Sequence, residues 1–117
     1  GLLTGNIRLG AEIKLRHYNL WDAFVTGGFG DDHEDRAEIA RVAAARGSRV
    51  LKRSLSGDEI LVIGDTPRDV ACGRAIGAKC LAVATGGATL EQLRDCNPDW
   101  AVRDLEEIKA ADVCGNQ

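Results

Sequence analysis

Short apolar runs alternate along this chain with segments whose apolar residues follow helical spacing. The clearest run covers residues 60–63, where four consecutive apolar residues predict a strand covered on both faces, as in parallel sheets. Four other short runs predict further strands, at residues 2–4, 23–25, 80–84 and 100–102. Strands that alternate with helices imply right-handed crossovers, so the pattern predicts a doubly wound parallel α/β sheet.

The segments between these strands predict helices. The first begins at Asn6, a favourable N-cap residue, and places four apolar residues on one face: Ile7, Ala11, Leu15 and Tyr18. The second follows the acidic run at residues 30–35, which we interpret as a solvated loop, and ends at Gly47; residues 48–58 are then a connection. Three further helices are expected at residues 67–76, from Thr89, and at residues 105–111.

The segment after the clearest strand brings two carboxylates together. Gly64 permits a tight turn and leaves room for a ligand near Asp65, while Pro67 suits the first position of a helix. Asp69 lies four residues after Asp65, so both carboxylates can serve one hard cation such as Mg²⁺. A structural alternative is that Thr66 and Asp69 only form a capping box at the start of the helix.

The residues after the first strand suit a phosphate group. Thr4 supplies a hydroxyl, and Gly5 and Asn6 open a helix N-terminus, whose free N–H groups and partial positive charge favour an anion. Arg36, early in the second helix, adds a fixed cation. Since parallel strands end at one edge of a sheet, we expect these groups to meet Asp65 and Asp69 there and to polarise a phosphoryl group.

Composition excludes several other classes of protein. The chain has 117 residues, 44% of them hydrophobic, and a net charge of −3, which argues against a nucleic-acid or membrane-surface role. It contains no apolar run of membrane-spanning length and no signal peptide. His17 and His33 lack partners at ligand spacing and are expected at the surface. The four cysteines lack zinc-site spacing and indicate free thiols in the cytoplasm: Cys72, Cys80, Cys96 and Cys114.

Three motifs of this chain resemble those of the haloacid dehalogenase-like (HAD) hydrolases, and the phosphoglycolate-phosphatase-like branch is most similar. Leu-Leu-Thr-Gly-Asn at residues 2–6 resembles the family's phosphate-binding second motif. Ile-Gly-Asp-Thr-Pro-Arg-Asp at residues 63–69 resembles the metal-binding fourth motif, and residues 75–87 resemble the helix, strand and glycine segment after it. The resemblance covers residues 2–102 and implies the HAD-like Rossmannoid core, Mg²⁺, and Asp65 and Asp69 as its ligands.

The chain also departs from the family pattern. Arg36 stands where the third motif commonly has Lys, and the two cations differ in geometry. The first motif, Asp-x-Asp, which supplies the nucleophile, does not occur. The resemblance therefore implies that residues 1–117 are the C-terminal portion of a core domain, incomplete at its N-terminal side. It also places a missing strand between residues 2–4 and 60–63, so we expect the chain alone to be marginally stable and prone to aggregation.

These observations lead to one favoured function and two alternatives. The resemblance implies a Mg²⁺-dependent phosphatase that acts on a small phosphorylated metabolite through an aspartyl-phosphate, with the fragment alone inactive. The carboxylate pair favours phosphoryl transfer over dehalogenation. The first alternative is a non-catalytic remnant or regulatory module, suggested by the missing nucleophile. A phosphoacceptor receiver domain is less favoured, because Thr85-Gly86-Gly87 stands where it needs Lys. The sequence assigns no substrate and no oligomeric state.

Overall fold

The computed structural model describes residues 1–114 of the chain. They form two compact units, one from Gly1 to Leu55 and one that begins at Ser56, and each is described by itself below. Every strand pairing within them is parallel. The predicted α/β class with parallel sheets is therefore confirmed. None of the helices in the described part of the chain combines the length and the apolar character needed to cross a bilayer.

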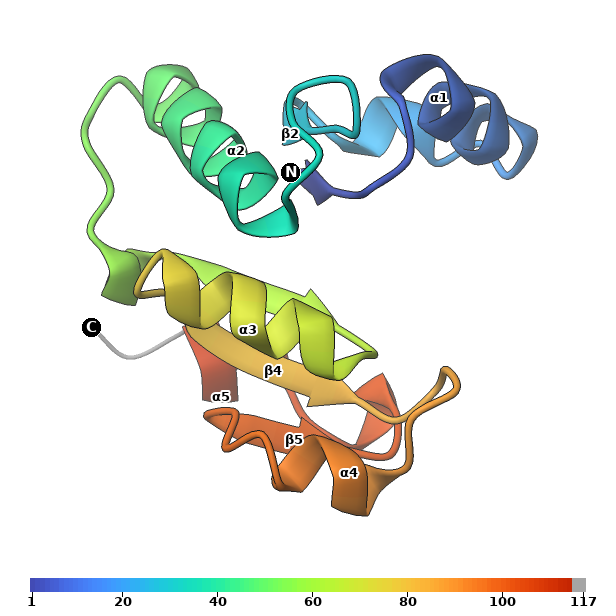
Figure 1. Cartoon of the computed structure of the whole chain (residues 1–117), viewed down its shortest axis with the longest axis vertical. Helices are drawn as coiled ribbons and strands as arrows, with labels where there is room; N and C mark the ends of the chain where they lie inside the picture. The colour runs from blue at the N-terminus through green and yellow to red at the C-terminus, as the bar shows by residue number, and fades with distance from the viewer. Residues whose placement is uncertain (115–117) are drawn as a thin grey trace. The chain divides into compact units, whose positions relative to one another are not determined.

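The first unit contains a two-stranded parallel sheet. Strand β1 (Leu2–Leu3) pairs with β2 (Gly27–Gly28), and the chain between them forms α1 (Arg8–His17) and the 3-10 helix η1 (Trp21–Ala23). Helix α2 (Arg36–Leu51) follows and packs beside β2 (Figure 1). This arrangement brings the residues after β1 close to the first turn of α2.

The strand predicted at residues 23–25, ending at Gly27-Gly28, is present but was placed too early in the chain. Residues Trp21–Ala23 form the 3-10 helix instead, Val25 is 81% exposed, and the strand lies at Gly27–Gly28. A Cβ atom on Gly28 would lie 2.5 Å from the carbonyl oxygen of Ile39 in α2. Glycine is therefore required where β2 meets this helix, and an apolar-run criterion does not recognise such a strand.

Two predicted helix boundaries in this unit are also wrong. Asn6 is not the N-cap of α1; Ile7 occupies that position, and the Asn6 backbone N–H donates to the Thr4 hydroxyl oxygen at 3.1 Å. Helix α2 does not end at Gly47 but continues to Leu51 and ends at Lys52, which has the left-handed φ of 59°. A terminating glycine needs that left-handed conformation, and here a lysine adopts it.

The apolar face predicted for α1 is only partly buried. Ala11 is buried, whereas Ile7 is 57% exposed and Tyr18 is 70% exposed. Leu9 and Ile13, on another side of the helix, are each 63% exposed. Helical spacing therefore located the helix correctly, but it did not determine how much of its surface is covered.

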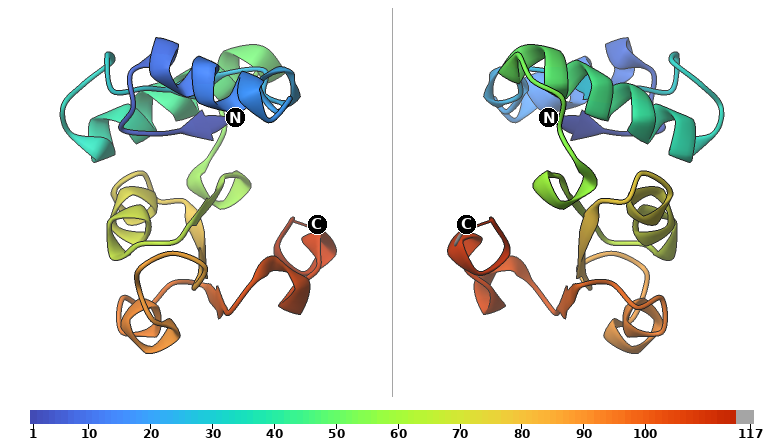
Figure 2. Two further views of the ribbon diagram at one scale, coloured as in Figure 1. Left: turned by 90° about the vertical axis from the view of Figure 1, so that its right-hand side faces the viewer. Right: turned by 90° about the vertical axis from the view of Figure 1, so that its left-hand side faces the viewer.

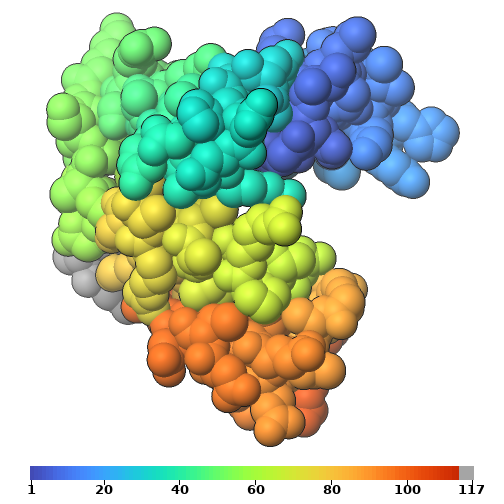
Figure 3. Space-filling model, in the orientation of Figure 1, coloured from blue at the N-terminus to red at the C-terminus, as the bar shows by residue number. Residues whose placement is uncertain are grey.

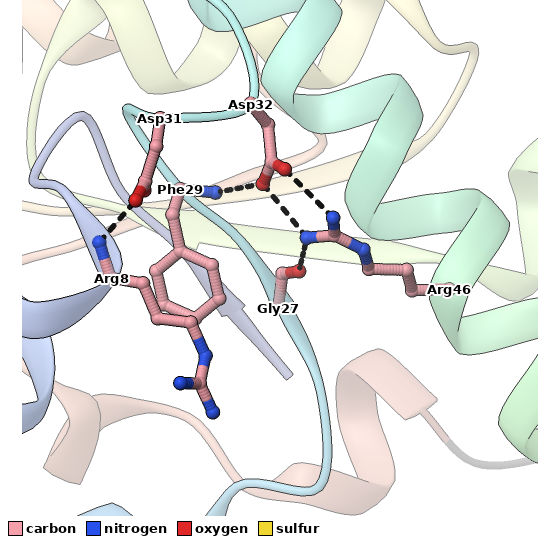
Figure 4. A network of polar contacts seen from close by, with 6 residues as sticks. All are labelled: Arg8, Gly27, Phe29, Asp31, Asp32 and Arg46. Carbon is pink, nitrogen blue, oxygen red and sulfur yellow. Dashed lines mark hydrogen bonds and ion pairs between the residues drawn. The ribbon is translucent and has the colours of Figure 1, made fainter.

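The sequence suggested that the acidic run after β2 is a solvated loop, but two of its carboxylates accept hydrogen bonds from other elements of this unit. Asp32 accepts two hydrogen bonds from the Arg46 guanidinium, both at 2.7 Å, and a third from the Phe29 backbone N–H at 2.9 Å (Figure 4). Arg46 also donates to the Gly27 carbonyl oxygen at 2.8 Å. Asp31 accepts from the Arg8 N–H at the start of α1. These contacts fasten the loop to β2, α1 and α2.

Replacing Arg46 should lower the stability of this unit in a pH-dependent way. The Arg46 guanidinium lowers the pKa of Asp32, so the pair stabilises the fold fully above the ordinary pKa of Asp32, and the contribution disappears as pH falls through the lowered pKa. We expect Arg46→Met to cost about 1 kcal/mol at pH 7, since both side chains are partly exposed. Urea unfolding at pH 7 and in acid measures this difference. Arg49→Met, at an exposed position of the same helix, is the control, and an equal loss in both variants would contradict the assignment.

The second unit is a three-stranded parallel sheet in the order β3-β4-β5. Val62 is in register with Cys80, and Ala82 with Ala101. Helices α3 and α4 lie on one side of this sheet, and the described chain after β5, up to residue 114, lies on the other side (Figure 2). Its main elements are β3 (Leu61–Gly64), α3 (Pro67–Ala75), β4 (Lys79–Val83), α4 (Leu90–Arg94) and β5 (Trp100–Val102). Its shorter helices are η2 (Gly57–Glu59), η3 (Leu105–Glu107) and α5 (Ala110–Cys114).

The core of the second unit lies between β4 and the helices α3 and α4. Leu93 is fully buried, and it clusters with Val70, Cys80 and Ala82. Burial raises the pKa of the Cys80 thiol. Cys72, Cys80 and Cys96 are free thiols, whereas the side chain of Cys114 lies outside those the structure describes.

The prediction that β3 is covered on both faces is wrong for one face. Val62 is 8% exposed, but Ile63, which points the opposite way, is 54% exposed. Among the described residues no strand pairing joins β1 to β3, so the parallel strands form two separate sheets. A further strand between residues 2–4 and 60–63 stays a prediction.

Candidate functional site

The end of β3 leads directly into a capped helix that fixes one of the two predicted carboxylates. Asp69 accepts three hydrogen bonds at Oδ2, from the backbone N–H groups of Asp65 and Thr66, at 3.0 and 3.1 Å, and from the Thr66 hydroxyl at 2.9 Å. Thr66 is the N-cap of α3 and accepts from the Asp69 N–H, and Pro67 occupies the first turn. The predicted capping box is therefore confirmed, and Asp69 holds the backbone at Asp65 in place. Its being the sole role of these residues stays a hypothesis.

Two glycines lie against the two carboxylates. A Cβ atom on Gly64 would lie 2.3 Å from Cγ of Asp69. The Asp69 side chain therefore takes the space that a side chain at position 64 would need. Gly64 and Asp65 also line a hollow, so the expected space for a ligand near Asp65 is present. A Cβ atom on Gly86, in the loop after β4, would lie 2.3 Å from Oδ2 of Asp65. Both carboxylates depend on glycine neighbours for their positions.

A hollow adjoins Asp65 at the carboxyl ends of β3 and β4. Its volume is about 300 Å³, at the lower end of the range for small-molecule sites. Asp65 is its one charged lining residue, whereas the other lining side chains are apolar apart from Thr85. The lining consists of Ile63, Gly64, Asp65, Val83, Thr85 and Leu105.

The carboxylate pair suits Mg²⁺ better than a metal that needs a closed protein cage. In residues 1–114 no three His, Cys, Asp or Glu side chains gather closely enough to hold a metal ion. Mg²⁺ commonly binds through one or two carboxylates and completes its octahedron with waters and phosphate oxygens. Asp65 and Asp69, both half-buried at one strand end, provide such a donor set.

The predicted phosphate-binding residues lie together in the first unit. Thr4 continues β1 by donating its N–H to the Gly28 carbonyl oxygen at 3.1 Å, and Asn6 accepts from the Gly30 N–H at 2.7 Å. Arg36 is the first residue of α2, and its Nε and Nη2 atoms would lie 3.1 and 3.2 Å from a Cβ atom on Gly5. The guanidinium therefore lies against the Gly5 backbone.

The predicted site residues thus form two groups, one in each unit, and the members of each group lie close together. Thr4, Gly5, Asn6 and Arg36 form the first group, and Asp65 and Asp69 form the second. Their meeting at one sheet edge, and their catalytic, phosphate-binding and metal-binding roles, stay predictions. The sequence interpretation missed the contact of Gly86 with Asp65.

A larger hollow, of about 490 Å³, lies elsewhere in the first unit. Trp21 and Phe29 line it, with ring centroids 6.2 Å apart, and the Arg8 guanidinium lies 5.3 Å from the Trp21 ring centroid. None of the predicted phosphate-binding or metal-binding residues lines this hollow. Size alone therefore does not identify the candidate site.

Comparison with known proteins identifies the family of this chain. The HAD-hydrolase-like family model matches residues 36–108, which include α2 and the segment that carries Asp65 and Asp69. The chain belongs to the HAD-like hydrolase family. A Clostridium perfringens protein named "Putative pyrophosphatase PpaX" is 32% identical to this HAD-like chain over 95 residues. The match covers 78% of the present chain and 40% of that relative.

Solved structures of low sequence identity share the HAD-like fold. A predicted phosphatase from Clostridium acetobutylicum superposes with a TM-score of 0.73 at 19% identity. The match covers 91% of the present chain and 48% of the phosphatase chain. The haloacid dehalogenase-like family protein SP0104 from Streptococcus pneumoniae gives a TM-score of 0.75 at 18% identity. That match covers 90% of the present chain and 48% of the SP0104 chain. This HAD-like chain therefore spans less than half the length of these relatives.

Proposed function

We propose that this chain is part of a Mg²⁺-dependent phosphoric monoester hydrolase that acts on a small phosphorylated metabolite. The observation that carries the proposal is the position of the Arg36 guanidinium against the Gly5 backbone, just after β1. A delocalised cation with several donors is suited to a phosphate group, which it can bind through two oxygens. The proposed setting is the cytoplasm, and neither nucleic acid nor a membrane is a proposed partner.

The phosphate-binding part of the proposal rests on Thr4, Gly5, Asn6 and Arg36. The Thr4 hydroxyl oxygen accepts the Asn6 N–H, which leaves its own O–H to donate to a phosphate oxygen. Gly5 has no side chain that would separate a phosphate from the backbone. Arg36 supplies positive charge that stabilises the charge developing on the transferred phosphoryl group.

The metal-binding part rests on Asp65 and Asp69. Bound there, Mg²⁺ would supply Lewis-acid stabilisation of phosphate charge. Asp65 offers its carboxylate at the end of β3, while Asp69 holds the Asp65 backbone through Oδ2. The capping box thus fixes the Asp69 side chain and the Asp65 backbone before a cation binds.

We assign the nucleophile to an aspartate outside these 117 residues, because the chain contains no Asp-x-Asp motif. Its carboxylate oxygen would form a bond to phosphorus while the bond from phosphorus to the ester oxygen breaks, and the leaving oxygen takes a proton. Water then attacks the phosphorus of the acyl phosphate. This second step releases inorganic phosphate and restores the carboxylate.

Phosphatase assays of the 117-residue chain, alone and extended by its upstream coding region, test the proposal. p-Nitrophenyl phosphate and inorganic pyrophosphate are the probes, the second because of the name of the Clostridium perfringens relative. We expect turnover only by the extended protein with Mg²⁺, and about a 100-fold loss in Asp65→Asn. Asp95→Asn, at an exposed position of the same unit, should keep full activity.

Two outcomes would contradict this proposal in different ways. Turnover by the 117-residue chain alone would show that the nucleophile lies within it. A folded extended protein without turnover of either probe would favour the non-catalytic module instead.

A further inference from the structure

The loop between β4 and α4 closes on Asp65. The segment between these elements reaches the surface of the second unit (Figure 3). Its residues Thr85, Gly86 and Gly87 are exposed. A Cβ atom on Gly86 would lie 2.3 Å from Oδ2, 2.9 Å from Cγ and 3.3 Å from Cβ of Asp65. Real Cβ atoms essentially never approach another atom below 3.0 Å. Any side chain at position 86 would therefore displace the Asp65 carboxylate or the loop itself.

The neighbouring glycine makes no such contact. A Cβ atom on Gly87 would meet nothing within 4 Å, although the two glycines are adjacent in one loop. Neither has a φ in the left-handed region, so an alanine at either position is free of backbone strain. The requirement for glycine at position 86 thus arises from the Asp65 side chain and not from the turn.

We propose that Gly86 is a positioning residue that fixes the Asp65 carboxylate for cation binding. The inference rests on the proposed function, in which Asp65 is a metal ligand. Contact with the Gly86 backbone limits rotation of the carboxylate about its side-chain bonds, while the Asp69 hydrogen bond fixes the backbone of Asp65. A ligand held in place before binding loses less conformational freedom when the cation arrives.

An alanine at position 86 should disturb this arrangement. The new methyl group requires Oδ2 of Asp65 to move away by several tenths of an ångström, or the loop to move by the same amount. Changes in the residues that orient a metal ligand commonly weaken metal affinity about 10- to 100-fold. The same change at Gly87 adds a methyl group to open space and should leave the affinity unaltered.

Binding of Mn²⁺ alone, followed by the electron paramagnetic resonance signal of the free ion, tests this inference in the full 117-residue chain. We expect Gly86→Ala to bind Mn²⁺ at least about 10-fold more weakly than the unaltered protein. Gly87→Ala should bind within about 2-fold of it, while Asp65→Asn should lose the site. Circular dichroism checks that each variant is folded.

The possible results separate the inference from the proposed function. If the unaltered chain binds no Mn²⁺, or Asp65→Asn binds it equally well, the proposed metal site is wrong and the inference falls with it. If Asp65→Asn loses binding but Gly86→Ala keeps the full affinity, the metal site stands and the positioning role of Gly86 is overturned.

A stability measurement covers the case in which Gly86→Ala folds poorly. The variant is compared in two backgrounds, with Asp65 and with Asp65→Ala, which removes the atoms nearest to the new methyl group. We expect Gly86→Ala to lower the free energy of unfolding only where the carboxylate is present, since contacting residues are thermodynamically coupled. An equal loss in both backgrounds would show that the methyl group disturbs the loop itself, and this would overturn the inference.

Discussion

Gly30→Ala should displace the turn at Gly5 and Asn6 and unfold much of the first unit. A Cβ atom at position 30 would lie 2.2 Å from the Gly5 carbonyl oxygen, and backbone atoms cannot rotate away as a side chain can. The displacement should also lengthen or break the hydrogen bond from the Gly30 N–H to the Asn6 carbonyl oxygen. We expect the free energy of unfolding to fall by at least about 2 kcal/mol, measured by urea titration.

The matched control is Gly10→Ala, the same chemical change inside α1. Its Cβ atom would meet only the Ile7 side chain, at an ordinary distance of 3.7 Å. Alanine favours helix over glycine, so this variant should gain about 0.5–1 kcal/mol. Should Gly30→Ala unfold at the same urea concentration as the unaltered protein, the close approach of residue 30 to the turn would be incorrect.

Leu93→Ala should be the most damaging apolar substitution in the second unit. Leu93 has no exposed surface and packs with Val70, Cys80 and Ala82 in the core. Removing three buried carbon atoms leaves a cavity, which typically costs about 2–5 kcal/mol. For a domain whose total stability is of that order, the thermal melting transition should shift strongly downward or disappear.

Leu105→Ala provides the comparison for this prediction. Leu105 is 57% exposed, so the same truncation removes little buried surface and should cost less than about 1 kcal/mol. Similar melting temperatures for the two variants would mean that Leu93 is not in the core. The comparison holds side-chain size constant and changes only burial.

The sequence predicted the parts of the fold that depend on local signals. The capping boxes of Thr66 with Asp69 and of Thr89 with Gln92 begin α3 and α4 as expected. Gly77, with its φ of 71°, follows the end of α3. In each case the signal and the structure lie within a few residues, so the pattern contains the necessary information.

Features that depend on distant residues were not predictable in this way. Strand β2 consists of two glycines, and the requirement for Gly28 follows from the approach of Ile39 in α2, whereas Gly27 lies against Leu2 of β1. The same limit applied to the site, where the sequence placed Asp65 at a strand end but gave no sign that Gly86 contacts it. Asp32 was assigned to a solvated loop because its partner Arg46 lies far along the chain.

The parallel pairings have a consequence for the order in which the chain can fold. Among the described residues, each pairing joins strands that follow one another in sequence: Leu2 with Gly27, Leu61 with Lys79, and Leu81 with Trp100. The chain that must close to form each pairing is therefore little longer than one crossover, which keeps the entropy cost of closure low. Each unit consists of one contiguous stretch of chain, so each can assemble without waiting for strands from the other unit.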